Sequence, residues 1–97
     1  MQTITLEMAV RPSHRDRLLT WLTARLPETR NAKGCRGIEA YASGRDPDRL
    51  TLIEQWDSTA EYEAYLEGRW RSGVLAELVG MLRADPVITY WTHHPTT

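Results

Sequence analysis

Three large aromatic side chains with polar edges, Trp56, Tyr62 and Tyr65, lie at the junction of a predicted strand and a predicted helix. Ser58 is placed to cap this helix, and Glu61, three residues later, can reach back to the cap. Two tyrosines spaced three apart occupy adjacent parts of one helix face. We therefore expect the three rings to converge, either on a slot for a flat aromatic ligand or in an ordinary corner of the core.

The same helix carries a positive charge near this cluster. Arg69 lies four residues after Tyr65 on the same face, where its guanidinium could hold an anionic oxygen, although a solvated helix charge is the structural alternative. Trp70, one step round the helix, suits packing and is a further candidate for the wall of a binding site. Tyr41 and Leu52, on two predicted strands, are candidates for its floor or wall.

Composition limits the classes of partner. The chain has 97 residues, which predicts a single domain over 1–97, and its 12 basic and 13 acidic residues leave a net charge of −1. No basic patch or tail stands out, so we expect no nucleic-acid partner. No apolar run reaches the length of a membrane span, so we expect no membrane partner either, and the alternating first ten residues do not form a signal peptide. The single Cys35 excludes an intrachain disulfide and favours a reducing, cytoplasmic compartment.

Hydrophobic periodicity predicts the elements that position these residues. Residues 1–10 alternate as a half-buried strand, and Ser13 is expected to cap a helix that Pro27 kinks or restarts. The remaining predicted elements are strands at 35–43, 50–56 and 87–92, helices at 59–73 and 74–82, and a frayed tail at 93–97.

This order of elements predicts an α+β fold of the ferredoxin-like split β-α-β type, with a four-stranded antiparallel sheet and helices on one face. The strands at 50–56 and 87–92 carry apolar residues on both sides. A sheet face open to water alternates between apolar and polar residues, so the second face should be covered. A second copy of the chain is the simplest cover, which predicts a homodimer.

Several short motifs in their order and spacing resemble the antibiotic biosynthesis monooxygenase (ABM) family of the dimeric α/β-barrel superfamily. The matching residues are Gly34-Cys35-x-Gly37, Glu54-x-Trp56-x-Ser58, Tyr62-x-x-Tyr65-Leu66, Arg69 and Pro86-x-Ile88-x-Tyr90. The resemblance implies a homodimer whose sheets face each other, with a substrate site in each subunit between sheet and helices. It also implies oxidation of phenolic polyketides or quinols by O2 without flavin, haem or metal.

Two positions depart from the family pattern. Leu52 stands where family oxygenases often carry asparagine, and Tyr65 stands where many members carry a histidine, which the haem-degrading branch uses as its iron ligand. We therefore expect no haem. His93 and His94 are adjacent, so on a strand they would point to opposite faces, which does not suit a shared metal.

Cofactor-free oxygenation requires the substrate to lose a proton and then to pass electrons to O2. In this hypothesis Trp56 orients the ligand, Tyr65 relays the proton and Arg69 stabilises the anion, with Tyr62 as a further binding residue. Two alternatives remain open: a non-redox enzyme on the same scaffold, such as a polyketide cyclase or lactone isomerase, and a ligand-binding dimer without catalysis. Oxygen consumption with naphthols, anthrones and hydroquinones separates the first hypothesis from the non-redox enzyme, and a ligand-induced melting shift without turnover would favour the ligand-binding dimer.

Overall fold

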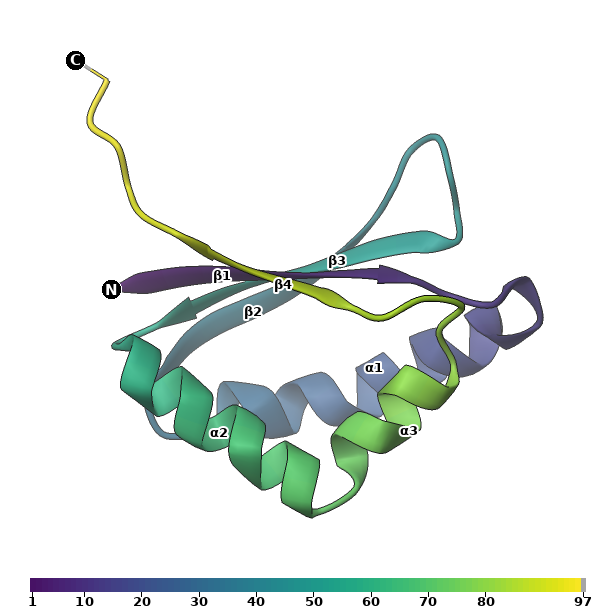
Figure 1. The fold of residues 1–97 in the computed structure, drawn as a ribbon, viewed down its shortest axis with the longest axis horizontal. Coiled ribbons are helices and arrows are strands. Elements are labelled where there is room, and N and C mark those ends of the chain that lie inside the picture. The colour runs from purple at the N-terminus through teal and green to yellow at the C-terminus, as the bar shows by residue number, and fades with distance from the viewer. Residues whose placement is uncertain (97) are drawn as a thin grey trace.

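The computed structural model describes residues 1–96 and has the predicted order of elements (Figure 1). The strands are β1 (Gln2–Ala9), β2 (Cys35–Ala42), β3 (Arg49–Trp56) and β4 (Val87–Trp91), and the helices are η1 (Pro12–His14, a 3-10 turn), α1 (Arg15–Arg30), α2 (Thr59–Arg71) and α3 (Val74–Gly80). Residues 93–96 have no regular secondary structure, and the last residue of the predicted tail lies outside the described residues.

The four strands form one antiparallel sheet in the order β2-β3-β1-β4, with β1 paired to both β3 and β4. Leu6, near the middle of β1, pairs with Leu52 on one side and with Ile88 on the other. All the helices lie on one face of this sheet (Figure 1). The predicted α+β, ferredoxin-like fold with helices on one face is therefore confirmed.

The covered face holds the hydrophobic core. Alternate residues from Ile4 of β1 to Val10, just after its end, are buried against the helices, as period-two alternation predicts. The larger core cluster packs all of these except Ile4 against Leu18 and Leu22 of α1. A smaller cluster at the start of α2 consists of Ile4, Trp56 and Tyr62.

The turn between β3 and α2 is fixed by its sequence. The Ser58 hydroxyl accepts a hydrogen bond of 3.2 Å from the Glu61 backbone N–H and donates one of 3.1 Å to the Glu61 carboxylate. The predicted cap is confirmed, although Glu61 binds the Ser58 hydroxyl rather than its backbone N–H. Gly34 has φ +88°, and a Cβ there would collide with the Glu61 side chain, so glycine is required where α1 turns into β2.

The start of α1 differs from the prediction. Ser13 does not cap the helix: it lies in the 3-10 turn, its hydroxyl is 3.0 Å from His14 Nδ1, and α1 begins at Arg15. Proline favours the first position of a helical turn, so the turn begins at Pro12 and Ser13 lies inside it rather than before it. Pro27 lies inside α1, which continues to Arg30 without a restart. Burial of Leu22 and Thr29 on either side of the proline holds this part of the helix against the sheet.

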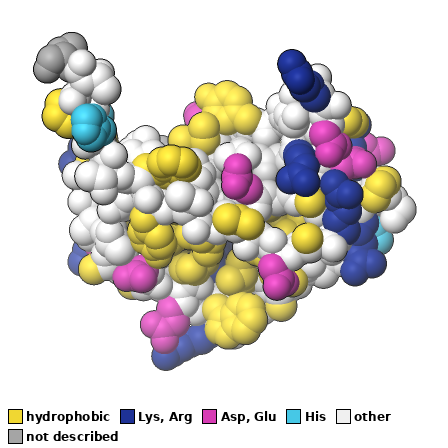
Figure 2. All heavy atoms as spheres, turned by 45° about the horizontal axis from the view of Figure 1, so that its top comes forward, with side chains coloured by type: hydrophobic (Ala, Val, Ile, Leu, Met, Phe, Trp, Pro, Cys, Tyr) yellow, Lys and Arg dark blue, Asp and Glu magenta, His cyan; other side chains and the backbone are white. Residues whose placement is uncertain are grey.

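The other face of the sheet carries no element of the described chain (Figure 1). Four large apolar side chains are exposed on or beside it: Tyr41, Ile53, Val87 and Trp91. Figure 2 turns this face partly toward the viewer and shows hydrophobic side chains spread over it, with an acidic side chain among them, whereas most of the basic side chains in view gather at one end. Among the residues described, no helix combines the length and the apolar character that a membrane crossing needs.

Candidate active site

A cavity of about 60 Å³ lies between the covered face of the sheet and the helices. Leucine and isoleucine side chains form most of its wall, including Leu52 from β3. Its polar atoms come from a few residues on three elements, namely Glu54 on β3, Arg25 and Thr29 on α1, and Tyr65 and Arg69 on α2. An apolar space with a few convergent polar groups is the usual form of a small-molecule site.

The most unusual group in this wall is Glu54. Its side chain occupies a buried-face position of β3, between Leu52 and Trp56, and the residue is only 3% exposed. The Trp56 indole Nε1–H donates a hydrogen bond of 3.0 Å to Glu54 Oε1. The second oxygen, Oε2, has no hydrogen-bond partner among the described residues. Every fully buried side-chain polar atom in that part of the chain has one, so Oε2 is not fully buried and faces the cavity that Glu54 lines.

Burial sets the protonation of Glu54. Removal from water raises the pKa of its carboxyl to about 7, and the hydrogen bond from Trp56 offsets only part of that increase. The group therefore changes its charge near neutral pH. A carboxylate with this pKa in an apolar space can accept a proton from a bound hydroxyl compound and release it again.

The predicted aromatic cluster forms. The ring centroids of Trp56 and Tyr62 are 5.6 Å apart in an edge-on arrangement, and those of Trp56 and Tyr65 are 5.0 Å apart. Trp56 is fully buried and does not line the cavity, and its N–H is bound to Glu54. The structure thus places Trp56 behind Glu54, where it holds the carboxylate, rather than against the ligand space. Tyr62 lines the cavity, and burial raises its pKa well above the usual range.

Tyr65 and Arg69 lie together at the cavity, as their spacing predicts. Arg69 Nε donates a hydrogen bond of 2.9 Å to the Tyr65 hydroxyl, which shares a second of 2.5 Å with the buried Thr29 hydroxyl. Arg69 Nη1 is 2.9 Å from Glu28 Oε1, and this hydrogen bond holds the pKa of Glu28 below its usual value. Hydrogen bonds therefore link a charged guanidinium, a phenol and a threonine hydroxyl in the cavity wall, and the Thr29 hydroxyl in turn donates one of 3.5 Å to the Arg25 carbonyl.

Sequence comparison decides the family. The sequence model described as antibiotic biosynthesis monooxygenase matches residues 1–69. The chain is also 32% identical over 77 residues to the probable quinol monooxygenase YgiN of Escherichia coli K12, in an alignment covering 69% of this chain and 74% of YgiN. The chain belongs to the antibiotic biosynthesis monooxygenase family.

Solved structures agree with the family on the fold. A crystal structure of an antibiotic biosynthesis monooxygenase superposes with a TM-score of 0.88 at 17% identity, covering 98% of this chain and 100% of the other. Rv0793 from Mycobacterium tuberculosis gives a TM-score of 0.85 at 21% identity, covering 97% and 95%. A conserved protein from Methanosarcina mazei Go1 gives 0.85 at 17%, covering 93% and 89%. At these identities the likeness shows a shared fold.

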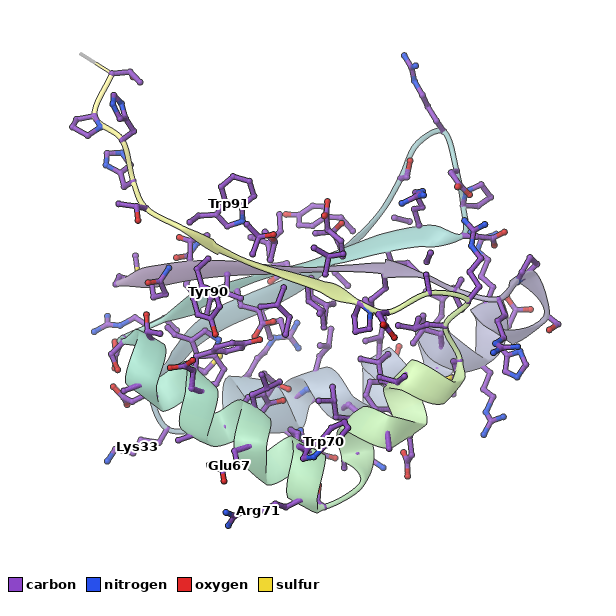
Figure 3. All side chains as sticks on the ribbon, in the orientation of Figure 1. Lys33, Glu67, Trp70, Arg71, Tyr90 and Trp91 are labelled. Atoms are coloured by element: carbon purple, nitrogen blue, oxygen red, sulfur yellow. The ribbon has the colours of Figure 1, made fainter. Side chains whose placement is uncertain are left out.

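Two of the candidate binding residues of this family member lie away from the cavity. Tyr41 is 56% exposed on the open face of the sheet, because its position in β2 alternates away from the buried Ile38. Trp70 is 63% exposed, lies near the end of α2 that leads to α3 (Figure 3) and does not line the cavity. Tyr90 and Trp91 point to opposite faces of β4, and Tyr90 packs edge-on against Tyr62 at 5.8 Å (Figure 3).

The sequence contained a signal for Glu54 that the prediction did not use. Leu50, Leu52, Glu54 and Trp56 occupy alternate positions of one strand, so a carboxylate stands in an otherwise apolar row. A charged residue on a buried face is rare unless it is paired or functional. Thr29 and Glu28 carried no comparable signal, because their role depends on where α1 meets α2.

Metal ligation has no support in the described residues, where no three histidine, cysteine or acidic side chains gather into a possible metal site. The polar groups at the cavity are of two other kinds. Glu54 is a proton acceptor of near-neutral pKa, and Tyr65 with Arg69 is a donor pair. Together they can remove a proton from a hydroxyl group and stabilise the anion that results.

Proposed function

We propose that this protein is a monooxygenase of phenols or quinols that uses O2 and needs no flavin, haem or metal, because the substrate supplies the electrons. For a hydroquinone, one substrate and one O2 give a hydroxyquinone and one water. One oxygen atom enters the ring, the other leaves as water, and the four electrons that reduce O2 come from the ring. The similarity to YgiN, a probable quinol monooxygenase, supports this class of substrate.

The observation that carries this proposal is Glu54. A phenol reacts with O2 only after it loses its proton, so the site needs a base that is ionised near neutral pH yet sits in a dry space. Glu54 meets both conditions, with a pKa of about 7 and a position in the apolar wall of the cavity. It takes the place that the sequence alone had assigned to Tyr65 as the first proton acceptor.

Other groups then have defined tasks. Trp56 holds the Glu54 carboxylate in place through its hydrogen bond of 3.0 Å, so its role is positioning rather than contact with the ligand. The Tyr65 hydroxyl, polarised by Arg69 at 2.9 Å, stabilises the oxyanion of the deprotonated substrate. The leucine and isoleucine wall excludes water, which strengthens both electrostatic effects.

The second candidate is a non-redox cyclase or isomerase, and the same observation favours it. A buried base beside a phenol and guanidinium donor pair also suits removal of a proton next to a carbonyl, with the enolate held by Tyr65. Such a reaction rearranges the substrate without consuming O2. Oxygen uptake is therefore the measurement that separates the two.

We propose that the protein is a cytoplasmic homodimer of single-domain subunits, which contact each other through their open sheet faces. Four large apolar side chains exposed on that face support this arrangement, since a monomer of this size rarely leaves such a group in water. Assembly in this way leaves the helix side, and with it the cavity, at the outer surface of each subunit.

The proposal is tested with purified protein, a panel of hydroquinones, naphthols and anthrones, and an oxygen electrode. We expect O2 uptake above the uncatalysed rate with at least one compound, and one labelled oxygen atom in the product when isotopically labelled O2 is supplied. A chelator should not change the rate. Conversion of a substrate without O2 uptake would instead establish the non-redox reaction, and binding without conversion would establish a ligand-binding protein.

A further inference from the structure

The cavity is smaller than its proposed ligands. Its volume is about 60 Å³, whereas a cavity that binds benzene measures about 150 Å³. Small shifts of the leucine side chains in its wall can make room for one ring. Two fused rings need more space than rotamer changes provide, so an element of the wall has to move.

The helices that enclose the cavity meet through side chains rather than through close backbone packing. The backbone of α2 packs against α3 and that of α1 against β2, but α1 makes no comparable backbone contact with α2 or α3. At one end of this seam Trp21 Nε1 donates a hydrogen bond of 2.9 Å to Glu77 Oε2, and Arg25 Nη2 lies 3.8 Å from the same oxygen. At the other end Tyr65 and Arg69 of α2 bind Thr29 and Glu28 of α1.

The end that carries Glu77 is the easier one to open. Glu77 lies on α3, a helix of seven residues that begins after Gly73 at φ +82° and ends at Gly80. Its carboxylate side chain is 55% exposed, so water competes for both of its partners. At the opposite end the Thr29 hydroxyl is buried, and the four side chains that meet there belong to longer helices.

We propose that α3 is a movable cover of the cavity and that Glu77, bound to Trp21 and Arg25, is the latch that limits the size of ring system admitted. One-ring phenols enter with side-chain shifts, whereas two-ring compounds require α3 to move away from α1. Only molecules with the latch open can bind a two-ring ligand. The apparent affinity for such ligands therefore equals the affinity of the open form multiplied by the open fraction. This inference deepens the proposed function, and it concerns binding rather than oxygenation.

The test measures binding of phenol and 1-naphthol under nitrogen, so that no oxygenation occurs. Glu77→Ala removes both bonds of the latch. We expect the ratio of the phenol Kd to the naphthol Kd to rise by about fivefold, the effect of releasing one net hydrogen bond. In the wild type, raising the KCl concentration should increase the same ratio, since salt screens the Arg25–Glu77 attraction. This salt effect should be absent in Glu77→Ala.

The chain supplies a matched control. Glu67→Ala removes a carboxylate that pairs with Arg71 at 2.6 Å on the outer side of α2, away from the cavity (Figure 3). It should leave both Kd values and their salt dependence as in the wild type. Glu77→Gln keeps the size of the side chain but removes the charge that attracts Arg25, so it should raise the ratio less than Glu77→Ala and should also lose the salt dependence.

Two results would overturn the latch. One is an unchanged ratio of the two Kd values in Glu77→Ala, whether or not both change together, and the other is a failure of folded Glu77→Ala to bind naphthol. Each differs from a failure of the proposed function, which would show as absent O2 uptake by the wild type whatever its binding.

Discussion

Adjacent residues on the two faces of β3 reverse the usual rule of burial. Ile53 is 38% exposed on the open face, whereas Glu54 is 3% exposed among the helices. An isoleucine normally gains stability from burial and a glutamate loses it. A strand selected for monomer stability alone would carry the two residue types the other way round. Each face therefore indicates something beyond folding: a partner surface on one side and chemistry on the other.

The first way to break this comparison is Glu54→Gln, for which we expect the largest effect. Glutamine keeps the size and can still accept the hydrogen bond from Trp56, but it cannot accept a proton from the substrate. Turnover of a confirmed substrate should fall by about 10²-fold or more, the usual contribution of a general base. In the wild type, turnover should rise with pH through about 7 as Glu54 ionises.

Glu67→Gln is the matched control for this prediction. It makes the same chemical change at an exposed carboxylate on the outer side of α2 and should leave turnover and its pH profile as in the wild type. Full activity of a folded Glu54→Gln enzyme would show that the buried carboxylate is not the base.

The second test is the pH dependence of stability. The folded pKa of Glu54, about 7, lies above the usual glutamate value of 4.5, so between these values the folded state holds more protons than the unfolded state. The free energy of unfolding is therefore highest, as far as Glu54 is concerned, below pH 4.5, where the group is neutral in both states, and it falls as the pH rises through about 7. Compared with Glu54→Gln, the wild type should lose roughly 3 kcal/mol of unfolding free energy between pH 4 and pH 8.

Urea unfolding of both proteins at fixed protein concentration measures this difference. Comparison with the variant removes the contribution of the other carboxylates, including Glu28, whose lowered pKa acts in the opposite direction. Parallel stability curves for the two proteins would mean that Glu54 has the same pKa in the folded and unfolded states, as it would if water reached it.

The third test concerns the open face. Ile53→Lys puts a charge into the proposed dimer interface, and within the subunit the new lysine faces Glu39 across the β2–β3 ladder, which favours the folded chain. We expect the dimer to weaken by about 10²-fold, because the lysine ammonium would have to give up its water on assembly, which pairing with Glu39 only partly offsets. Analytical ultracentrifugation over a range of concentrations measures this dissociation constant.

Leu19→Lys provides the comparison for Ile53→Lys. Leu19 is 40% exposed, close to the 38% of Ile53, but lies on α1 instead of the sheet. Its substitution should leave the assembly state unchanged. A wild-type protein that remains monomeric at micromolar concentration would remove the partner surface from the comparison altogether.

How much of this could be predicted depends on the range of the interactions involved. The strands, the capped start of α2 and the aromatic cluster follow from local periodicity and from Ser58, and the structure confirms them. Ser13 failed as a cap because the preceding proline starts a 3-10 turn, also a local effect but a competing one. Tyr41 and Trp70 were misplaced because residue type was given more weight than the face each residue occupies.

The site itself depends on contacts between segments far apart in the chain. Thr29 meets Tyr65, and Glu28 meets Arg69, only because α1 and α2 cover the same sheet face. No spacing within the sequence encodes that meeting. The cavity and the charge state of Glu54 are properties of the same packing, since a carboxylate acquires a high pKa only where other elements exclude water from it.

The smallest expected effect is that of Tyr65→Phe. It compares the catalytic contribution of a helix residue, Tyr65, with that of the sheet residue Glu54 on the same covered face. Tyr65→Phe keeps the ring that packs at 5.0 Å from Trp56 but removes the hydroxyl that joins Thr29 to Arg69. If Glu54 takes the proton and Tyr65 only stabilises the anion, turnover should fall by about tenfold, less than for Glu54→Gln. Steady-state kinetics should show the loss in kcat, with the pH profile still rising through about 7. A loss as large as that of Glu54→Gln, together with disappearance of that rise, would return the proton transfer to Tyr65 and leave the buried carboxylate with a structural role.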